Sequence, residues 1–163
     1  MKIIYCKGWS RRRKYANGEF SEKKALELYQ KRKPFGVVIE ENDTPYCFIN
    51  FNNKYIYVGF LDYLQRQYLG YEFTELEKDK IFLKEVQYWE YDENSDTKTF
   101  SDRYRFTPEG EMGIEKKNYL SKEVERLTAK NKIDTDKFYE KYPEFSDYAE
   151  IIKKEREILN SVS

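Results

Sequence analysis

The stretch YCFINFNNKYIYVGF, residues 46–60, shows most directly how this chain folds. Two runs rich in aromatic and β-branched residues lie on either side of Asn52-Asn53, and such runs are typical of β-strands. Asn tolerates a positive φ angle, so this pair predicts a two-residue turn between antiparallel strands. With so tight a turn, we expect Ile49 to lie opposite Ile56 on a face that belongs to the core.

The other face of this predicted hairpin is aromatic. It carries Tyr46, Phe48, Asn50, Tyr55 and Tyr57. The solvent side of an antiparallel sheet is ordinarily polar. We therefore expect a helix to cover this face or a partner to bind it.

Further strands are predicted on both sides of the hairpin. The stretch 99–107 alternates most regularly, with Phe100, Tyr104 and Phe106 on one side and polar residues on the other. The remaining predicted strands cover residues 35–40, 68–76 and 80–91, and a return strand contains Met112 and Ile114.

Helices are predicted near both ends of the chain. Ser21 is a capping residue for a helix that Pro34 stops. After residue 118 the apolar spacing becomes helical. Leu120, Val124 and Leu127 recur at i, i+4 and i+7, a short helix is expected after Asp134-Thr135, and a last helix begins at about Phe145.

These elements predict a single α+β domain over residues 1–163, since a chain of this length matches the usual size of about 150 residues per domain. Residues 1–34 form a basic segment with a helix. Residues 35–118 form an antiparallel sheet of about five to seven strands. Residues 119–163 supply helices that pack on the sheet.

Charge is unevenly distributed along a chain that is neutral overall, with 30 basic and 30 acidic residues. Residues 1–34 hold 11 Lys or Arg against 3 Glu, a net charge of +8, and residues 35–118 carry a net charge of −7. Such asymmetry affects encounters with charged partners more than it affects the fold.

The first residues resemble neither a signal peptide nor a membrane anchor. Four apolar residues between Lys2 and Lys7 fall short of the roughly 7–15 that a secretory signal needs. No apolar run approaches the ~18 residues of a membrane span. We therefore expect a cytoplasmic protein in which Cys6 and Cys47 are reduced thiols.

The composition argues against most enzyme chemistry. There is no histidine, so a Cys–His nucleophile is excluded, and none of the seven glycines forms a phosphate-binding loop. A metal-dependent nuclease could use Asp102 with Glu115 and Lys116-Lys117. Strand alternation, however, places Asp102 and Glu115 on opposite faces. We expect no enzyme, no cofactor and no bound metal.

The densest basic cluster is Arg11, Arg12, Arg13 and Lys14, beside Trp9 and Tyr15. One interpretation is a phosphate-binding patch with aromatic rings available for stacking, which predicts a nucleic-acid-binding or regulatory module. The other is a solvated loop, or half of an internal ion-pair system with the acidic middle of the chain.

Aromatic and acidic residues coincide in a second cluster. Tyr, Trp and Arg often anchor protein interfaces, and an acidic surface favours a basic partner. The predicted partner-binding residues are Tyr88, Trp89, Glu90, Asp92 and Glu93, together with Tyr55 and Tyr57.

Residues 46–118 resemble the small immunity proteins encoded beside bacterial polymorphic or contact-dependent growth inhibition toxins. The similarity lies in stretches such as YEFTELEKDKIFLKEVQYWEYDENSD and RYRFTPEGEMGIEKKN. It implies a cytoplasmic, non-enzymatic protein that binds one cognate toxin domain and neutralises it. Many such toxins are nucleases with basic clefts, which an acidic surface can block.

Overall fold

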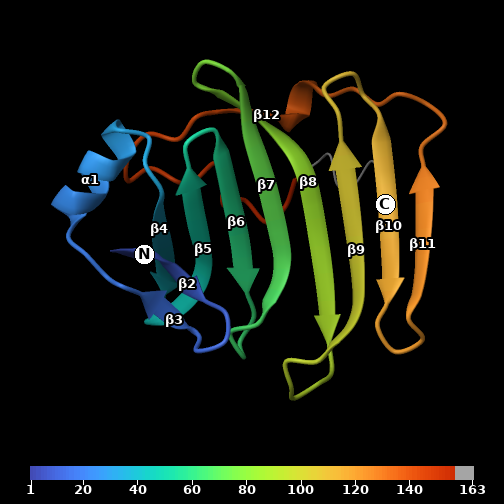
Figure 1. Ribbon diagram of the computed structural model, residues 1–163, viewed down its shortest axis with the longest axis horizontal. Helices are drawn as coiled ribbons and strands as arrows, with labels where there is room; N and C mark the ends of the chain where they lie inside the picture. The colour runs from blue at the N-terminus through green and yellow to red at the C-terminus, as the bar shows by residue number, and fades with distance from the viewer. Residues whose placement is uncertain (157–163) are drawn as a thin grey trace. The chain divides into compact units, whose positions relative to one another are not determined.

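The computed structural model describes residues 1–156, and strands dominate it (Figure 1). About 53% of these residues lie in strands and 8% in helices. The predicted α+β class with several packed helices is therefore wrong, and the fold is mostly β. Ten strands of the described chain belong to the larger antiparallel sheet and two more form a separate hairpin, against the five to seven strands predicted.

The chain divides into two compact units, Met1–Gly70 and Tyr71–Ser163, and each is described by itself. The single domain over residues 1–163 therefore stays a prediction. Strand β7 (Gln67–Glu77) contains the division.

The first unit is built on an antiparallel arrangement in the order β1-β4-β5-β6. A separate hairpin pairs β2 with β3. The elements are β1 (Lys2–Cys6), β2 (Gly8–Ser10), β3 (Tyr15–Asn17), α1 (Glu22–Gln30), β4 (Phe35–Glu41), β5 (Thr44–Asn52) and β6 (Tyr55–Leu61).

Helix α1 confirms the predicted N-terminal helix. Ser21 is its N-cap, and the Ser21 Oγ accepts a hydrogen bond of 3.1 Å from the backbone N–H of Lys24. This bond satisfies one of the amide groups that the first helical turn leaves without a partner. The completely buried Ala25 marks the side of the helix that faces the unit.

The β5–β6 hairpin turns one residue later than predicted. Asn53 has the positive φ angle, 55°, and Asn52 lies opposite Tyr55. Ile49 therefore pairs with Val58 rather than with Ile56. The register differs by two residues, which preserves the alternation of side chains, so the predicted core face is the one that is buried.

The aromatic face of this hairpin is covered by the β2–β3 hairpin rather than by a helix (Figure 1). The Trp9 ring stacks on Phe48 with centroids 6.2 Å apart, and it packs with Tyr57 against a buried cluster that includes Phe48. The approach is close enough that a Cβ at Gly36 would lie 2.8 Å from the Gly8 Cα. Glycine at position 36 therefore permits the β2–β3 hairpin to sit on β4.

The second unit continues with antiparallel strands in the order β8-β9-β10-β11, and β12 pairs with β8. Its elements are β8 (Lys80–Tyr91), β9 (Lys98–Phe106), β10 (Met112–Asn118), β11 (Glu123–Thr128), a 3-10 turn η1 (Asp136–Phe138) and β12 (Tyr139–Lys141).

The predicted C-terminal helices are absent from the described part of residues 119–163. The side-chain Oδ1 of Asn118 accepts hydrogen bonds from the amides of Leu120 and Ser121, and Lys122 has a φ of 63°. These features turn the chain into strand β11, whose six residues are all exposed. The helical spacing after residue 118 therefore does not correspond to a buried stripe. The end of the last predicted helix, residues 157–163, lies outside the described residues.

Extended chain and short turns take the place of these helices. Phe138, Tyr148 and Ile151 are buried, so the segment after β11 still contributes to the core of its unit. The longest helix in the described chain is the nine-residue α1, and no helix there has the length and apolar character to cross a membrane.

Candidate functional surfaces

The structure separates the predicted aromatic–acidic cluster along β8. Tyr88 lies opposite Asp102 of β9, whereas Trp89 lies opposite Ser101, so the two rings project from opposite faces of the sheet. The Trp89 ring instead makes a cation–π contact with the ammonium group of Lys98, which lies 5.6 Å from the ring centroid. Only Tyr88 and Glu90 of the predicted β8 residues share one face.

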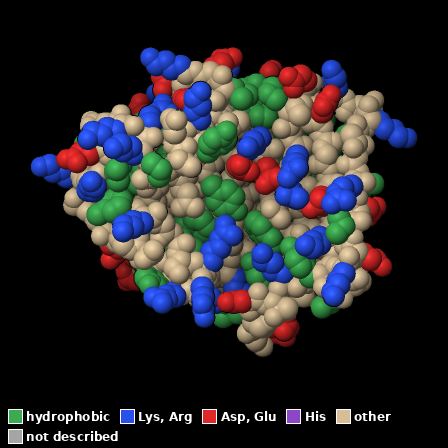
Figure 2. Space-filling model, in the orientation of Figure 1, with side chains coloured by type: hydrophobic (Ala, Val, Ile, Leu, Met, Phe, Trp, Pro, Cys, Tyr) green, Lys and Arg blue, Asp and Glu red, His purple; other side chains and the backbone are tan. Residues whose placement is uncertain are grey.

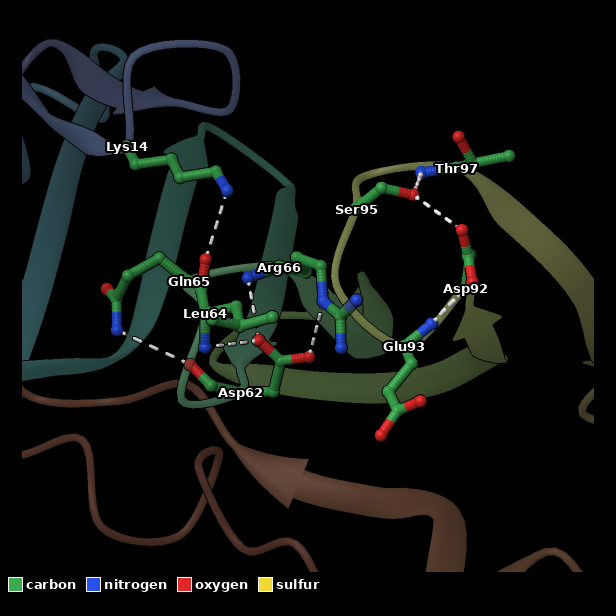
Figure 3. A network of polar contacts seen from close by, with 9 residues as sticks. All are labelled: Lys14, Asp62, Leu64, Gln65, Arg66, Asp92, Glu93, Ser95 and Thr97. Atoms are coloured by element: carbon green, nitrogen blue, oxygen red, sulfur yellow. Dashed lines mark hydrogen bonds and ion pairs between the residues drawn. The ribbon is translucent and has the colours of Figure 1, made fainter.

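Asp92 and Glu93 lie in the turn between β8 and β9. The Asp92 carboxylate accepts hydrogen bonds from the Glu93 amide at 2.8 Å and from the Ser95 hydroxyl at 3.3 Å (Figure 3). Asp92 therefore shapes the turn. Tyr55 and Tyr57 belong to β6 in the first unit, where Tyr55 is exposed and Tyr57 is half-buried.

Around Tyr88 and Glu90 the register of β8 and β9 assembles a surface that we call the acidic–aromatic face. Its members are Tyr88, Glu90, Phe100, Asp102 and Tyr104. The Tyr88 and Tyr104 rings meet edge to face with centroids 6.2 Å apart. Burial, with a smaller contribution from Tyr104, raises the pKa of Tyr88. Phe100 is 42% exposed, so one aromatic ring of the face is open to solvent.

A hollow of about 610 Å³ extends this face across β9, β10 and β11. Lys116 lies between Asp102 on β9 and Glu125 on β11. The hollow is lined by Phe100, Asp102, Lys116, Lys117, Asn118, Glu123, Val124 and Glu125. Three carboxylates and two ammonium groups therefore surround it. Sequence reasoning did not identify Glu123 and Glu125, because it assigned their strand to a helix.

The opposite face of the same strands carries a ladder of ion pairs. Arg103 lies between two carboxylates, with 3.8 Å from its Nη1 to the Glu85 Oε1 and 2.7 Å from its Nη2 to the Glu115 Oε1. Arg105 also reaches Glu85 at 3.0 Å, and Arg126 reaches Glu115 at 3.1 Å. Figure 2 shows acidic and basic side chains interspersed in this manner over the displayed surface.

This ladder bears directly on the nuclease hypothesis. Glu115 lies opposite Arg103, and Asp102 lies opposite Lys116, so the two carboxylates are on different faces of the sheet, as the alternation predicts. Hydrogen bonds from Arg103 and Arg126 lower the pKa of Glu115, with the Arg103 bond contributing most. Residues 1–156 hold no group of three His, Cys, Asp or Glu side chains arranged to bind a metal.

Glu115→Gln is expected to lower the free energy of unfolding by about 0.5–1 kcal/mol at pH 7, because the two arginines lose an ionised partner. The native pairing lowers the pKa of Glu115, so its contribution is complete above the ordinary glutamate pKa. The contribution is lost as the pH falls through the lowered native value.

The measurement is urea denaturation of both proteins at several pH values. The stability difference should be largest at neutral pH and should shrink below pH ~4. Glu109→Gln is the control, because Glu109 is exposed and lies in a turn. Equal stability of Glu115→Gln and the wild type at pH 7 would contradict the prediction.

The basic cluster forms the turn that joins β2 and β3. Arg11, Arg12 and Arg13 are exposed, and Lys14 is half-buried with a φ of 59°. The Lys14 ammonium group donates a 3.0 Å hydrogen bond to the carbonyl of Leu64 (Figure 3). Trp9 is half-buried, and one face of its ring already stacks on Phe48.

The two cysteines are both buried in the first unit. Burial raises the pKa of Cys6, which is unfavourable for a nucleophile because the thiolate is the reactive form. Cys47 lies opposite Ile39 and Phe60 on the core face of β5, where sequence alternation predicted it.

Comparison of the chain with protein-family models, curated proteins and solved structures gives no match.

Proposed function

We propose that this protein is a non-enzymatic, cytoplasmic immunity protein that captures a basic toxin domain through the acidic–aromatic face. The supporting observation is the assembly of Tyr88, Glu90, Phe100, Asp102 and Tyr104 on one side of β8 and β9. Two carboxylates and three aromatic rings lie there, and Lys116 of β10 lies opposite Asp102 at the edge of the face. The resemblance to immunity proteins supplies the biological role, and this face supplies a surface suited to it.

The physical properties of the face fit the capture of a basic domain. Opposite surface potentials raise association rates above the usual ~10⁵–10⁶ M⁻¹s⁻¹ of neutral pairs. Aromatic anchors that become fully desolvated then provide most of the affinity, within a rim of charges. Phe100 is an open anchor of this kind, and Glu90 is an exposed charge opposite it in the register.

The first experiment is affinity capture with the full chain from a nuclease-treated lysate of its own host, followed by identification of the bound protein. We expect one basic domain in a 1:1 complex, and co-expression of the chain should relieve the toxicity of that domain. Capture of no stoichiometric protein partner would contradict the proposal. So would a captured domain whose activity is unaffected by the chain.

The double substitution Glu90→Gln with Phe100→Ala is expected to weaken binding of the captured domain by at least about tenfold. Both side chains are exposed, so the fold should be retained. The matched control is Glu109→Gln with Leu76→Ala, which also removes one exposed acid and one exposed apolar side chain of the second unit. Titration calorimetry measures both. Equal affinities for the two variants would show that the acidic–aromatic face is not the binding surface.

A further inference from the structure

The turn between β2 and β3 concentrates positive charge that the first unit does not neutralise. We call Arg11, Arg12 and Arg13 the arginine tip. All three side chains are exposed, and among residues 1–156 none of them forms an ion pair. Within the first unit, these three residues therefore fit the interpretation of the cluster as a solvated loop.

The backbone of the tip is held in place by several hydrogen bonds. The Arg13 amide donates to the Ser10 hydroxyl at 3.2 Å, and the Lys14 amide donates to the Ser10 carbonyl at 2.6 Å. Lys14 also ties the tip to the turn between β6 and β7 through the Leu64 carbonyl. A ligand that binds here meets a turn that is already ordered, which reduces the entropy lost on binding.

The turn that receives Lys14 is itself fixed (Figure 3). One oxygen of the Asp62 carboxylate accepts hydrogen bonds of 2.9 Å from the amides of Leu64 and Arg66. The other oxygen pairs with the Arg66 guanidinium at 2.9 Å. This carboxylate is therefore committed to its own turn and to Arg66.

Aromatic rings lie next to the tip on β3 and β6. Tyr15 is 42% exposed, and its hydroxyl accepts a 3.3 Å hydrogen bond from the Arg13 guanidinium. On the other side, the Arg11 guanidinium carbon lies 6.0 Å from the centre of the Tyr57 ring. An exposed ring beside arginines is the combination with which proteins bind single-stranded nucleic acids, since every base offers a face for stacking.

We infer that the arginine tip binds the phosphate backbone of a single-stranded nucleic acid, with Tyr15 as the stacking surface for one base. Consecutive Cα atoms are about 3.8 Å apart, so three guanidinium groups cluster within a very short length of chain. Few surfaces other than a polyphosphate backbone present negative charge at such density. Each guanidinium also presents donors in a planar fork that matches phosphate oxygens. This surface shares no residue with the acidic–aromatic face.

The test is fluorescence anisotropy of a labelled oligouridylate of about 20 nucleotides with the full-length protein, at about 50 and 200 mM salt. We expect binding at the lower salt and a steep loss at the higher. Substituting all three tip arginines by glutamine should weaken binding at least tenfold. It should also reduce the slope of log K against log salt by about 2, since each contact on a single strand contributes roughly 0.7. Tyr15→Ala should weaken binding about tenfold with the slope unchanged.

The matched control replaces Lys23, Lys24 and Lys31 by glutamine, which removes the same charge from exposed positions of the same unit. This variant should keep most of the affinity. Equal losses in the two triple variants would overturn the inference, because net charge alone would then explain binding. Failure of the wild type to bind at low salt would overturn it too, as would equally tight binding of polyglutamate. None of these outcomes bears on capture of a basic domain by the acidic–aromatic face.

Discussion

Replacing Phe138 with alanine is expected to lower the free energy of unfolding of the second unit by about 3–5 kcal/mol. Phe138 is 2% exposed, and its ring centre lies 4.4 Å from that of Phe106 and 5.8 Å from that of Phe82. Removal of the ring takes away its apolar contacts and leaves a cavity that rigid strands β8 and β9 cannot fill completely. Guanidinium denaturation followed by far-ultraviolet circular dichroism measures the loss.

Two variants separate a cavity effect from a general effect of losing an aromatic ring. Phe138→Leu keeps most of the volume and should cost less than about 1.5 kcal/mol. Phe100→Ala removes an exposed ring of the same unit and should change stability by no more than about 0.5 kcal/mol. A Phe138→Ala protein as stable as Phe100→Ala would show that the segment around Phe138 is not packed as described.

Arg156→Ala is expected to lower the free energy of unfolding by about 3 kcal/mol, because it leaves a partly buried carboxylate without its partner. The Arg156 side chain is only 6% exposed and pairs with Glu140 of β12 at 3.0 Å. Its guanidinium also donates to the Glu150 carbonyl at 2.9 Å. The guanidinium carbon lies 4.9 Å from the centre of the Tyr71 ring, so the substitution removes a cation–π contact as well.

A double-mutant cycle tests whether the charge or the packing of Arg156 dominates. Arg156→Met retains an unbranched apolar stem near the Tyr71 ring, and Glu140→Gln removes the opposing charge. If the ion pair dominates, adding Glu140→Gln to Arg156→Met should restore part of the lost stability. Additive losses in the double variant would show that Arg156 acts mainly through its contacts with the aromatic rings and the Glu150 carbonyl.

Helix α1 and most strands could be predicted because their signals are local. Ser21 at the cap and Pro34 after the last turn act within a few residues of the helix. The alternation in residues 99–107 likewise reflects one strand, and it corresponds to β9 (Lys98–Phe106). The turn predicted at Asn52-Asn53 lies one residue too early. This error changes the predicted pairing by two residues, so each side chain is still assigned to the correct face of the hairpin.

The C-terminal region shows where local patterns failed. Val124 and Leu127 have helical spacing, yet both are exposed on β11, because pairing with β10 satisfies the backbone of this segment. The stabilisation of a strand comes from its neighbours, and apolar spacing alone contains no information about those neighbours. The β2–β3 hairpin was not predicted for the same reason. Its packing depends on the aromatic face of β5 and β6, which is distant in the sequence.

The same distinction between local signals and tertiary contacts applies to the candidate surfaces. The charge asymmetry, the clustering of Arg11–Arg13 and the presence of Tyr88 and Glu90 on one side of a strand could be predicted, since these depend on composition and alternation. The tertiary structure was needed to show that Phe100 and Asp102 join Tyr88, that Trp89 faces away, and that within residues 1–156 the arginines of the tip form no ion pair. These outcomes depend on cross-strand register and on contacts between distant segments. The contacts that stabilise this arrangement form only when segments distant in the sequence come together in the fold.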